Sequence, residues 1–168
     1  VCALELLRAG RSVIVVDRDT RERSGGLARW AFGGMALVGT PLQRRMRIPD
    51  TPETALRDWV RFGELDDGER WPLAWARHYV ERSCADVHDW LVGEGLRFMP
   101  AVNWVERGRH GDGNSLPRYH MLWGTAHALV LRLDAAMQAA GGGGRLRVLH
   151  RHRVVGIETA AGRIDGAQ

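Results

Sequence analysis

The 168-residue sequence is long enough for one domain with a sizeable core, and its 45% hydrophobic and 26% charged residues are ordinary for a globular protein. It has no apolar run long enough to span a bilayer and no basic-then-apolar secretory leader at its start. The net charge of +4 rests on arginines alone, and because these are scattered without interleaved aromatic residues we expect no nucleic-acid partner.

The first predicted elements are a helix and a strand. Residues 1–9 have apolar positions at helical spacing, and Gly10 follows where a C-terminal cap is expected. The β-branched run from Ser12 to Asp17, SVIVVD, is typical of a strand that is buried on both faces of a parallel sheet. The two segments together predict part of a βαβ unit.

The next segment, residues 24–40, is rich in glycine and poor in charge, so we expect a loop whose backbone approaches a ligand closely. Its first part, SGGLARWAFGGM, carries glycine pairs at positions 25–26 and 33–34. Because apolar residues such as Trp30 and Phe32 seldom lie free in solvent, an ordinary surface loop is disfavoured.

Three helices are predicted in the middle of the chain, by capping residues and apolar stripes. The first begins at Thr51-Pro52 and has Ala55, Leu56, Trp59 and Val60 as its apolar stripe. The others cover about 72–92, before Gly93 and Gly95, and about 125–140, before four glycines. Residues 100–123 are predicted to be irregular. After the last helix, a strand from Arg147 to Ile157, a turn at 160–162 and a returning strand at 163–167 predict a β-hairpin.

Asp17 ends its strand as the acid of a dinucleotide site does, about 20 residues beyond a glycine fingerprint. Counting back from Asp17 leads to a point before residue 1, so we expect a sequence that is truncated at its N-terminus and lacks the first strand and the fingerprint. Gln168 falls in a predicted strand, which indicates truncation at the other end as well. An ordinary helix–strand unit with an incidental acid is the alternative.

The order of VIVVD and SGGLARWAFGGM resembles the fumarate reductase and ketosteroid dehydrogenase class of FAD flavoproteins. The motifs PLQRRMRIPDTPETALRDW, FMPAVNWVERG, HGDGNSLPRYHMLWGT and RHRVVGIET are similar to one bacterial branch, the FAD-binding dehydrogenases. The resemblance implies an α/β fold: residues 1–168 would be a partial Rossmann-like FAD-binding domain, a parallel sheet with helices plus a β-hairpin, with its first strand missing. A capping domain and a C-terminal part would lie outside the chain with the catalytic groups, so no catalytic residue is named.

The resemblance also implies a path for the FAD. Asp17 would bind the ribose of the adenosine half, and main-chain groups at Val154 would hold the adenine. Leu27 stands where relatives carry a polar side chain, so only its backbone N–H could bind. The residues along the pyrophosphate, the ribityl chain and the flavin ring would be Ser24, Gly25, Gly26, Phe32, Gly33, Gly34 and Met35.

The best candidates for substrate contact lie in GNSLPRYHMLWGT, because Arg118, Tyr119 and His120 place a cation, a phenol and an imidazole in adjacent positions. Flavin chemistry needs a proton donor or acceptor beside the ring, and an arginine can hold a carboxylate or an enolate. Asn114 and Thr125 can add hydrogen bonds. The structural alternative, with Arg118 ion-paired, Tyr119 packed and His120 hydrogen-bonded in a loop, stays open.

The predicted function is that of an FAD-dependent oxidoreductase acting on a small organic substrate, at a carbon–carbon bond next to a carbonyl, with an unknown electron acceptor. An NAD(P)-dependent Rossmann oxidoreductase, which does not need the second glycine pair, and a non-enzymatic Arg-rich nucleic-acid-binding domain are the alternatives. Cys2 and Cys84 show no metal or redox spacing, which favours a reduced, cytoplasmic setting. His150 and His152 could converge on one face of a strand, but two ligands do not make a metal site, so no metal is expected.

Overall fold

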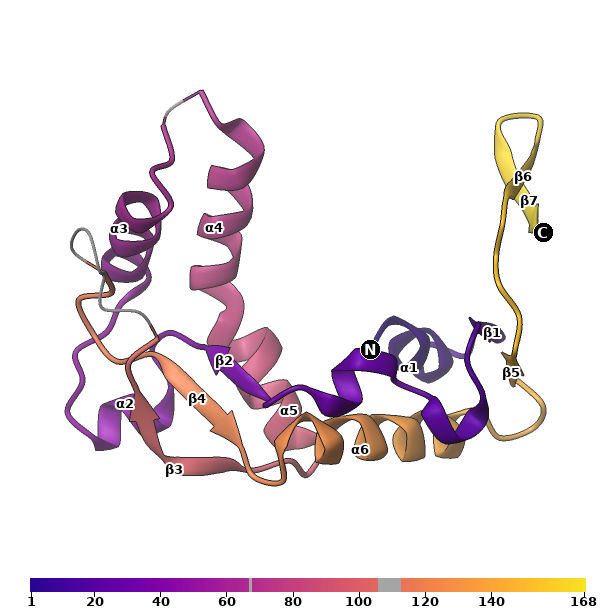
Figure 1. Ribbon diagram of the computed structural model, residues 1–168, viewed down its shortest axis with the longest axis horizontal. Helices are drawn as coiled ribbons and strands as arrows, with labels where there is room; N and C mark the ends of the chain where they lie inside the picture. Colours follow the sequence, from indigo (N-terminus) through magenta and orange to yellow (C-terminus); the bar gives the residue numbers. More distant parts are fainter. Residues whose placement is uncertain (67, 106–112) are drawn as a thin grey trace. The chain divides into compact units, whose positions relative to one another are not determined.

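The structure, a computed structural model, describes residues 1–66, 68–105 and 113–168 (Figure 1). The chain divides into two units, Val1–Ala31 with Val130–Gln168, and Phe32–Leu129. Helices occur together with parallel and antiparallel strands, which confirms the α/β class. Among the described residues no helix is both long enough and apolar enough to cross a membrane.

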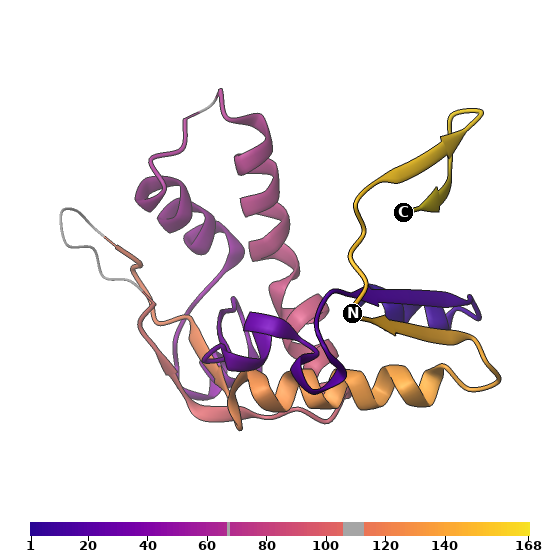
Figure 2. The ribbon, with the colours of Figure 1, turned by 45° about the vertical axis from the view of Figure 1, so that its right-hand side comes forward.

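The first unit is built on a parallel pair of strands, β1 (Val13–Asp17) and β5 (Leu146–His150), with Val13 opposite Leu146. Helix α1 (Cys2–Arg8) precedes β1, and α6 (Thr125–Ala140), whose residues from Val130 onward belong to this unit, precedes β5. Figure 2 shows the indigo β1 and the orange β5 side by side. The predicted first helix, the parallel strand and the helix at 125–140 are therefore confirmed.

Helix α1 ends as its sequence predicts. Gly10 has a φ of 77°, the left-handed conformation that glycine adopts without a steric penalty. The backbone N–H of Gly10 donates to the Leu7 carbonyl at 3.0 Å, and that of Arg11 donates to Leu6 at 2.9 Å. This pair of bonds is a Schellman motif, which satisfies carbonyls that the helix end leaves open.

The expectation that β1 is buried on both faces is wrong for this chain. Ile14 is 62% exposed and Val16 is 39% exposed, whereas Val13 and Val15 are half-buried. The described part of this sheet has two strands, and successive side chains of a strand point to opposite faces. The β-branched run SVIVVD therefore predicted the strand correctly, but not that the face with Ile14 and Val16 is exposed.

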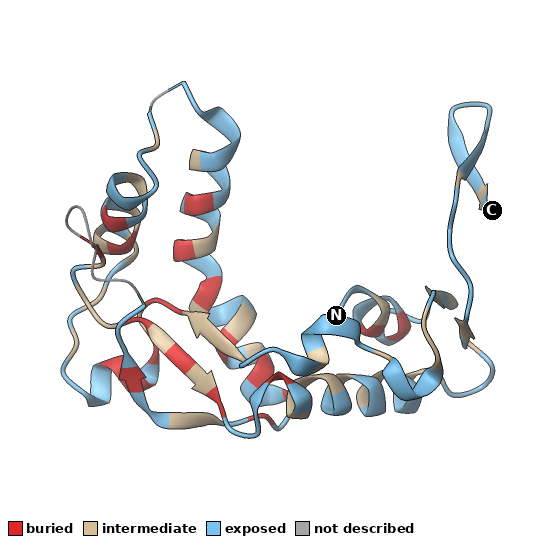
Figure 3. Cartoon of the chain, in the orientation of Figure 1, coloured by how far each residue is buried: buried red, intermediate tan, exposed pale blue. Residues whose placement is uncertain are grey.

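The single strand that was predicted from Arg147 to Ile157 is also wrong. Strand β5 ends at His150, because Arg151 takes a left-handed φ of 58° that a ladder does not accommodate. Strands β6 (Ile157–Ala160) and β7 (Arg163–Ala167) then form an antiparallel hairpin, mostly pale blue in Figure 3 because it is exposed. Its two turn residues, Ala161 and Gly162, both have positive φ, as a tight hairpin turn requires. The predicted hairpin itself is confirmed.

The second unit contains most of the helices: α2 (Pro41–Arg45), α3 (Pro52–Phe62), α4 (Arg70–Arg82), a π-helical segment (Ser83–Asp89) and α5 (Trp90–Gly93). Helices α3 and α4 lie side by side in Figures 1 and 2. Thr51 caps α3 by accepting the Thr54 N–H, as predicted. The helix predicted over 72–92 is confirmed, except that its middle is π-helical and that it begins at Arg70. Helix α2, capped by Thr40, was not predicted.

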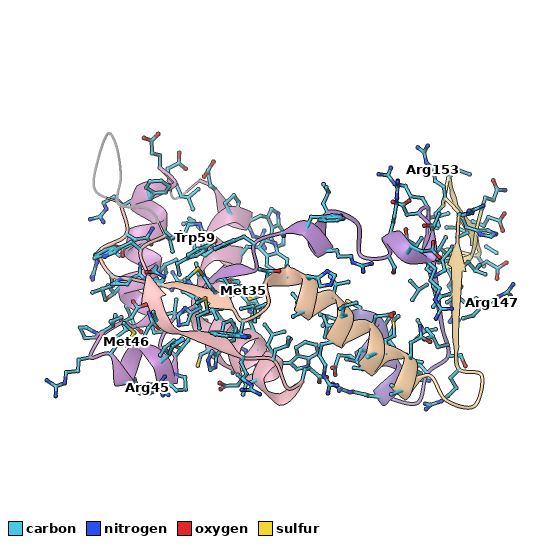
Figure 4. The ribbon with its side chains drawn as sticks, turned by 60° about the horizontal axis from the view of Figure 1, so that its bottom comes forward. Met35, Arg45, Met46, Trp59, Arg147 and Arg153 are labelled. Atoms are coloured by element: carbon cyan, nitrogen blue, oxygen red, sulfur yellow. The ribbon has the colours of Figure 1, made fainter. Side chains whose placement is uncertain are left out.

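An antiparallel sheet completes the second unit, in the order β2 (Gly34–Ala36), β4 (Tyr119–Leu122), β3 (Phe98–Asn103). The expectation that residues 100–123 are irregular is therefore wrong for β4 and for the end of β3, while residues 106–112 lie outside the described residues. Strand β4 has only four residues, and one of its two neighbours, β2, comes from far earlier in the chain, so no local pattern indicates it. One core cluster joins Leu91, Leu96 and Leu122 with the partly buried Met35 (Figure 4).

Candidate functional site

The first glycine pair is shaped by its backbone and by close packing. Gly25 has a φ of 93° and Gly26 a φ of 49°, and a short 3-10 helix, Gly26–Trp30, follows where a loop was expected. A Cβ on Gly25 would lie 2.5 Å from a methyl carbon of Val130, too close for any side chain. Position 25 thus requires glycine on two independent grounds.

A hollow of about 140 Å³ in the first unit brings several of the predicted residues together. Asp17 and Ser24 line it, together with Arg29 from the 3-10 helix and His150 from β5. The Asp17 carboxylate accepts the Asp19 N–H at 2.9 Å, which leaves lone pairs for another donor. Within the described residues, His150 Nδ1 is buried and has no hydrogen-bond partner. A ligand rich in hydroxyl groups, such as a ribose, fits these side chains.

The second glycine pair lies in the second unit, where it touches the start of α6 and the ring of Tyr119. A Cβ on Gly33, whose φ is 79°, would lie 2.6 Å from the backbone nitrogen of Ala126. A Cβ on Gly34 would lie 2.0 Å from the phenol of Tyr119. The Gly33 carbonyl accepts the Leu122 N–H at 3.0 Å. The backbone at 33–34 is therefore packed against the start of α6 and the ring of Tyr119 too closely for a side chain at either position.

The apolar residues around the glycine pairs are more exposed than the sequence predicted. Trp30 is 85% exposed and Phe32 is 60% exposed, so the expectation that they avoid solvent is wrong for these two, whereas Met35 is partly buried. Leu27 is 89% exposed. The 3-10 helix has no buried residue, because a helix of only five residues does not form an apolar face that packs on a core. Phe32 does find one partner: its ring stacks on that of Tyr119, with centroids 6.3 Å apart and planes within 10°.

Arg118, a predicted substrate contact, is buried in an ion-pair network. Its guanidinium donates to both carboxylate oxygens of Asp50, at 2.9 and 2.8 Å, and to Asp58 at 2.6 Å. It also donates to the side-chain oxygen of Asn114 at 2.9 Å, and only 3% of its side chain is exposed. Arg118 is therefore ion-paired, as in the structural alternative, and Asn114 is one of its partners.

Asp58 completes this network from α3. Burial alone would raise the pKa of Asp58, but hydrogen bonds from Ser115 and Arg118 outweigh it and hold the pKa below its usual value. Asp50, Asp58 and Ser115 were not predicted from the sequence. The available signal was an acid at position 58, three residues after the buried Ala55 on the face of α3 that was predicted to be apolar.

His120 is fully buried, and both of its ring nitrogens are used. Nδ1 lies 2.7 Å from the Arg118 carbonyl, and Nε2 lies 2.8 Å from the Thr40 hydroxyl. Because a carbonyl can only accept, Nδ1 carries the proton and Nε2 accepts from Thr40. Burial lowers the pKa of His120, which favours the neutral ring. The side chain thus joins β4 to the start of α2.

Tyr119 and Thr125 are the remaining substrate candidates. Tyr119 is half-buried between Phe32 and the backbone of Gly34. Thr125 is exposed at the start of α6, where its hydroxyl accepts the His127 N–H at 3.3 Å. In the first unit, Val154 is 44% exposed in the segment between β5 and β6. Of the five substrate candidates, the structure brings Tyr119 closest to the second glycine pair.

Comparison with known proteins gives a consistent result. A sequence model described as FAD binding domain matches residues 1–168. A KsdD-like steroid dehydrogenase of Mycolicibacterium smegmatis is 41% identical over 172 residues, covering 100% of this chain and 31% of that protein. One of Mycobacterium tuberculosis is 41% identical over 158 residues, covering 92% of this chain and 27% of that protein. The chain thus spans about a third or less of these relatives, and they confirm the resemblance stated from the motifs.

A solved structure shares the fold. The crystal structure of 3-ketosteroid-Δ4-(5α)-dehydrogenase from Rhodococcus jostii RHA1, in complex with 4-androstene-3,17-dione, aligns with a TM-score of 0.72. The alignment covers 98% of this chain and 38% of that chain, at 22% sequence identity. At this identity the likeness concerns the fold alone.

Proposed function

Because the chain belongs to the FAD binding domain family, we propose that it is the FAD-holding part of an FAD-dependent dehydrogenase. The whole protein transfers hydride between the flavin and a small organic substrate, at a carbon–carbon bond next to a carbonyl. The observation that carries this proposal is the match of the FAD binding domain over residues 1–168, which includes the tightly packed backbone at Gly33 and Gly34. The names of the KsdD-like relatives favour a ketosteroid as the substrate.

The finer fold follows from the same proposal. Strands β1 and β5, with α1 and α6, are part of the parallel sheet of a Rossmann-like FAD-binding domain. Residues 1–168 are one part of that domain, and the capping domain and the C-terminal part of the whole protein supply the catalytic groups. Strands β1 and β5 are parallel, and each follows a helix, α1 and α6 respectively. Parallel strands that alternate with helices are typical of doubly wound sheets, which supports this assignment.

Residues of the first unit would hold the adenosine half of FAD. The carboxylate of Asp17 accepts from the ribose hydroxyls, and the unpaired nitrogen of His150 offers a further contact in the same hollow. Main-chain groups at Val154 hold the adenine. The residues that follow the pyrophosphate are Ser24, Gly25, Gly26 and, through its backbone N–H, Leu27.

Residues of the second unit would hold the flavin half, with Phe32, Gly33, Gly34 and Met35 along the ribityl chain and the ring. When bound, FAD supplies the group that accepts the hydride. Tyr119, beside Gly34, is placed to bind the substrate or to move a proton through its hydroxyl, and Thr125 can donate a hydrogen bond. The buried Arg118 and His120, with the half-buried Asn114, act as positioning residues that hold β4, and with it Tyr119.

Cofactor identity and turnover of the whole protein test the proposal. We expect purified protein to carry FAD, identified by mass spectrometry after release, and to oxidise a 3-ketosteroid in the presence of an artificial electron-accepting dye. The family match favours FAD over the nicotinamide and nucleic-acid alternatives. A protein that stays colourless after addition of FAD, and that instead consumes NAD(P)H, would sink the proposal. The cytoplasmic setting and the absence of a nucleic-acid partner stay predictions.

A further inference from the structure

Three side chains of the second unit, each of a type that binds metal ions, meet on the π-helical segment Ser83–Asp89. The Cys84 sulfur, a ring nitrogen of His88 and a carboxylate oxygen of Asp89 all lie within 4.8 Å of one another. Cys84 Sγ is 4.0 Å from Asp89 Oδ2, and His88 Nδ1 is 2.7 Å from Asp89 Oδ1. The three ligand types are a thiol, an imidazole and a carboxylate, so the cluster is not merely a group of acids.

The π-helical turn is what brings the three together. In an α-helix each residue advances by about 100°, so Asp89, five positions after Cys84, would lie about 140° around the helix from it. A π-helix closes its hydrogen bonds five residues apart, which returns positions 88 and 89 to the same face as position 84. The site was not predicted from the sequence, because α-helical periodicity places Cys84 and Asp89 on different faces of the helix.

We propose that Cys84, His88 and Asp89 bind a zinc-like divalent cation, at a site separate from the proposed flavin contacts. Zinc prefers sulfur, nitrogen and carboxylate oxygen, and its bond lengths place tetrahedral ligand atoms about 3.4–3.6 Å apart. The observed separations of 2.7 and 4.0 Å bracket these values, so we expect small movements of the Cys84 and Asp89 side chains to bring the ligand atoms to zinc-binding distances. On binding, the Cys84 thiol releases its proton, and the thiolate and the carboxylate together neutralise the two charges of the ion.

The surroundings of the three side chains favour an ion at the protein surface, with one buried ligand whose orientation is fixed. His88 is buried, and its ring stacks on Phe98 with centroids 5.1 Å apart and planes within 13°, which fixes the imidazole. Cys84 is half-buried and Asp89 is exposed, so the ion can enter from solvent. Three protein ligands leave one position for water. The ion would join the two ends of the π-helical segment, between α4 and α5.

Protection of the thiol provides the test. The whole protein, stripped with a chelator, is alkylated with iodoacetamide with and without Zn²⁺, and peptide mass spectrometry follows Cys84 and Cys2 separately. We expect Zn²⁺ to slow alkylation of Cys84 but not of the exposed Cys2. Mg²⁺ should protect neither, because it is a poor partner for thiolates. An unchanged alkylation rate of Cys84 at saturating Zn²⁺ would overturn the proposal.

A matched pair of variants makes the test specific. Asp86 and Asp89 are both exposed on the same segment, but Asp86 pairs with Arg82 at 2.7 Å instead of facing Cys84. We expect Asp89→Asn to weaken Zn²⁺ binding in calorimetry at least about tenfold, and Asp86→Asn to leave it unchanged. Equal zinc affinity in the two variants would contradict the site. Neither substitution removes a buried group, so both variants should fold.

Discussion

Gly33 and Gly34 are the residues on which the flavin proposal depends most. At each position the structure leaves no room for a Cβ: the backbone nitrogen of Ala126 blocks one and the ring of Tyr119 blocks the other. This close packing fixes the path of the backbone at the segment that is proposed to run along the flavin.

Replacement of Gly34 by alanine should therefore affect cofactor binding more than folding. The added methyl group must push Tyr119 aside, and we expect FAD affinity to fall at least about tenfold, equivalent to about 1.4 kcal/mol. Release of flavin fluorescence on dilution of the whole protein measures this. Gly93→Ala is the control, because a Cβ there meets no atom within 4 Å and Gly93 lies in a helix. Equal FAD affinity in the two variants would contradict the role of Gly34.

Asp58 tests the structural role of the Arg118 network. Asp58→Asn leaves a buried guanidinium with one charged partner fewer, and we expect a loss of about 3–5 kcal/mol in the free energy of unfolding. Because folding lowers the pKa of Asp58, its stabilisation is complete above the unfolded-state value near 3.8 and is lost as the pH falls through the folded-state value. Urea unfolding at neutral and acidic pH measures both effects. The exposed Asp86→Asn should cost far less than Asp58→Asn, and equal costs for the two substitutions would contradict the structural role of the network.

At the scale of elements, the sequence predicted those parts that local rules decide. The caps at Thr51 and Gly10 and the glycines after α6 marked three helices correctly, because each signal acts within one turn. Strand β4 was missed because its partners β2 and β3 come from elsewhere in the chain. The same holds for the candidate site. The glycine pairs could be predicted from the sequence, whereas the hydrogen bonds from Arg118 to Asp50 and Asp58 could not, because they join residues 68 and 60 positions apart.

The cap of α3 gives a prediction at this scale. The Thr51 hydroxyl accepts the Thr54 N–H at 3.2 Å, so Thr51→Ala should lower the free energy of unfolding by about 1 kcal/mol. Thr51→Ser keeps the hydroxyl and should restore most of that loss. Thermal or urea unfolding of the two variants measures the difference. If serine and alanine are equally destabilising, the cap contributes nothing and the beginning of α3 is determined by packing alone.

At the scale of the whole molecule, the family match runs through both units of the chain, from residue 1 to residue 168. Each unit contributes its own half of the proposed contacts: Asp17 and His150 in the first, Gly33, Gly34 and Tyr119 in the second. The chain spans 31% of its Mycolicibacterium relative, so turnover is a property to be measured on the whole protein. No residue of this chain is assigned the transfer of hydride itself.

The most direct measurement is an anaerobic titration of the whole, FAD-loaded protein with a 3-ketosteroid. A dehydrogenase passes hydride from the substrate to the flavin, so the visible absorbance of the oxidised flavin should fall in proportion to the steroid added. Reoxidation by an added dye should then restore it. A protein that holds FAD but keeps its full oxidised absorbance with every 3-ketosteroid offered would contradict the proposed substrate class, and one that holds no FAD would contradict the proposed function itself.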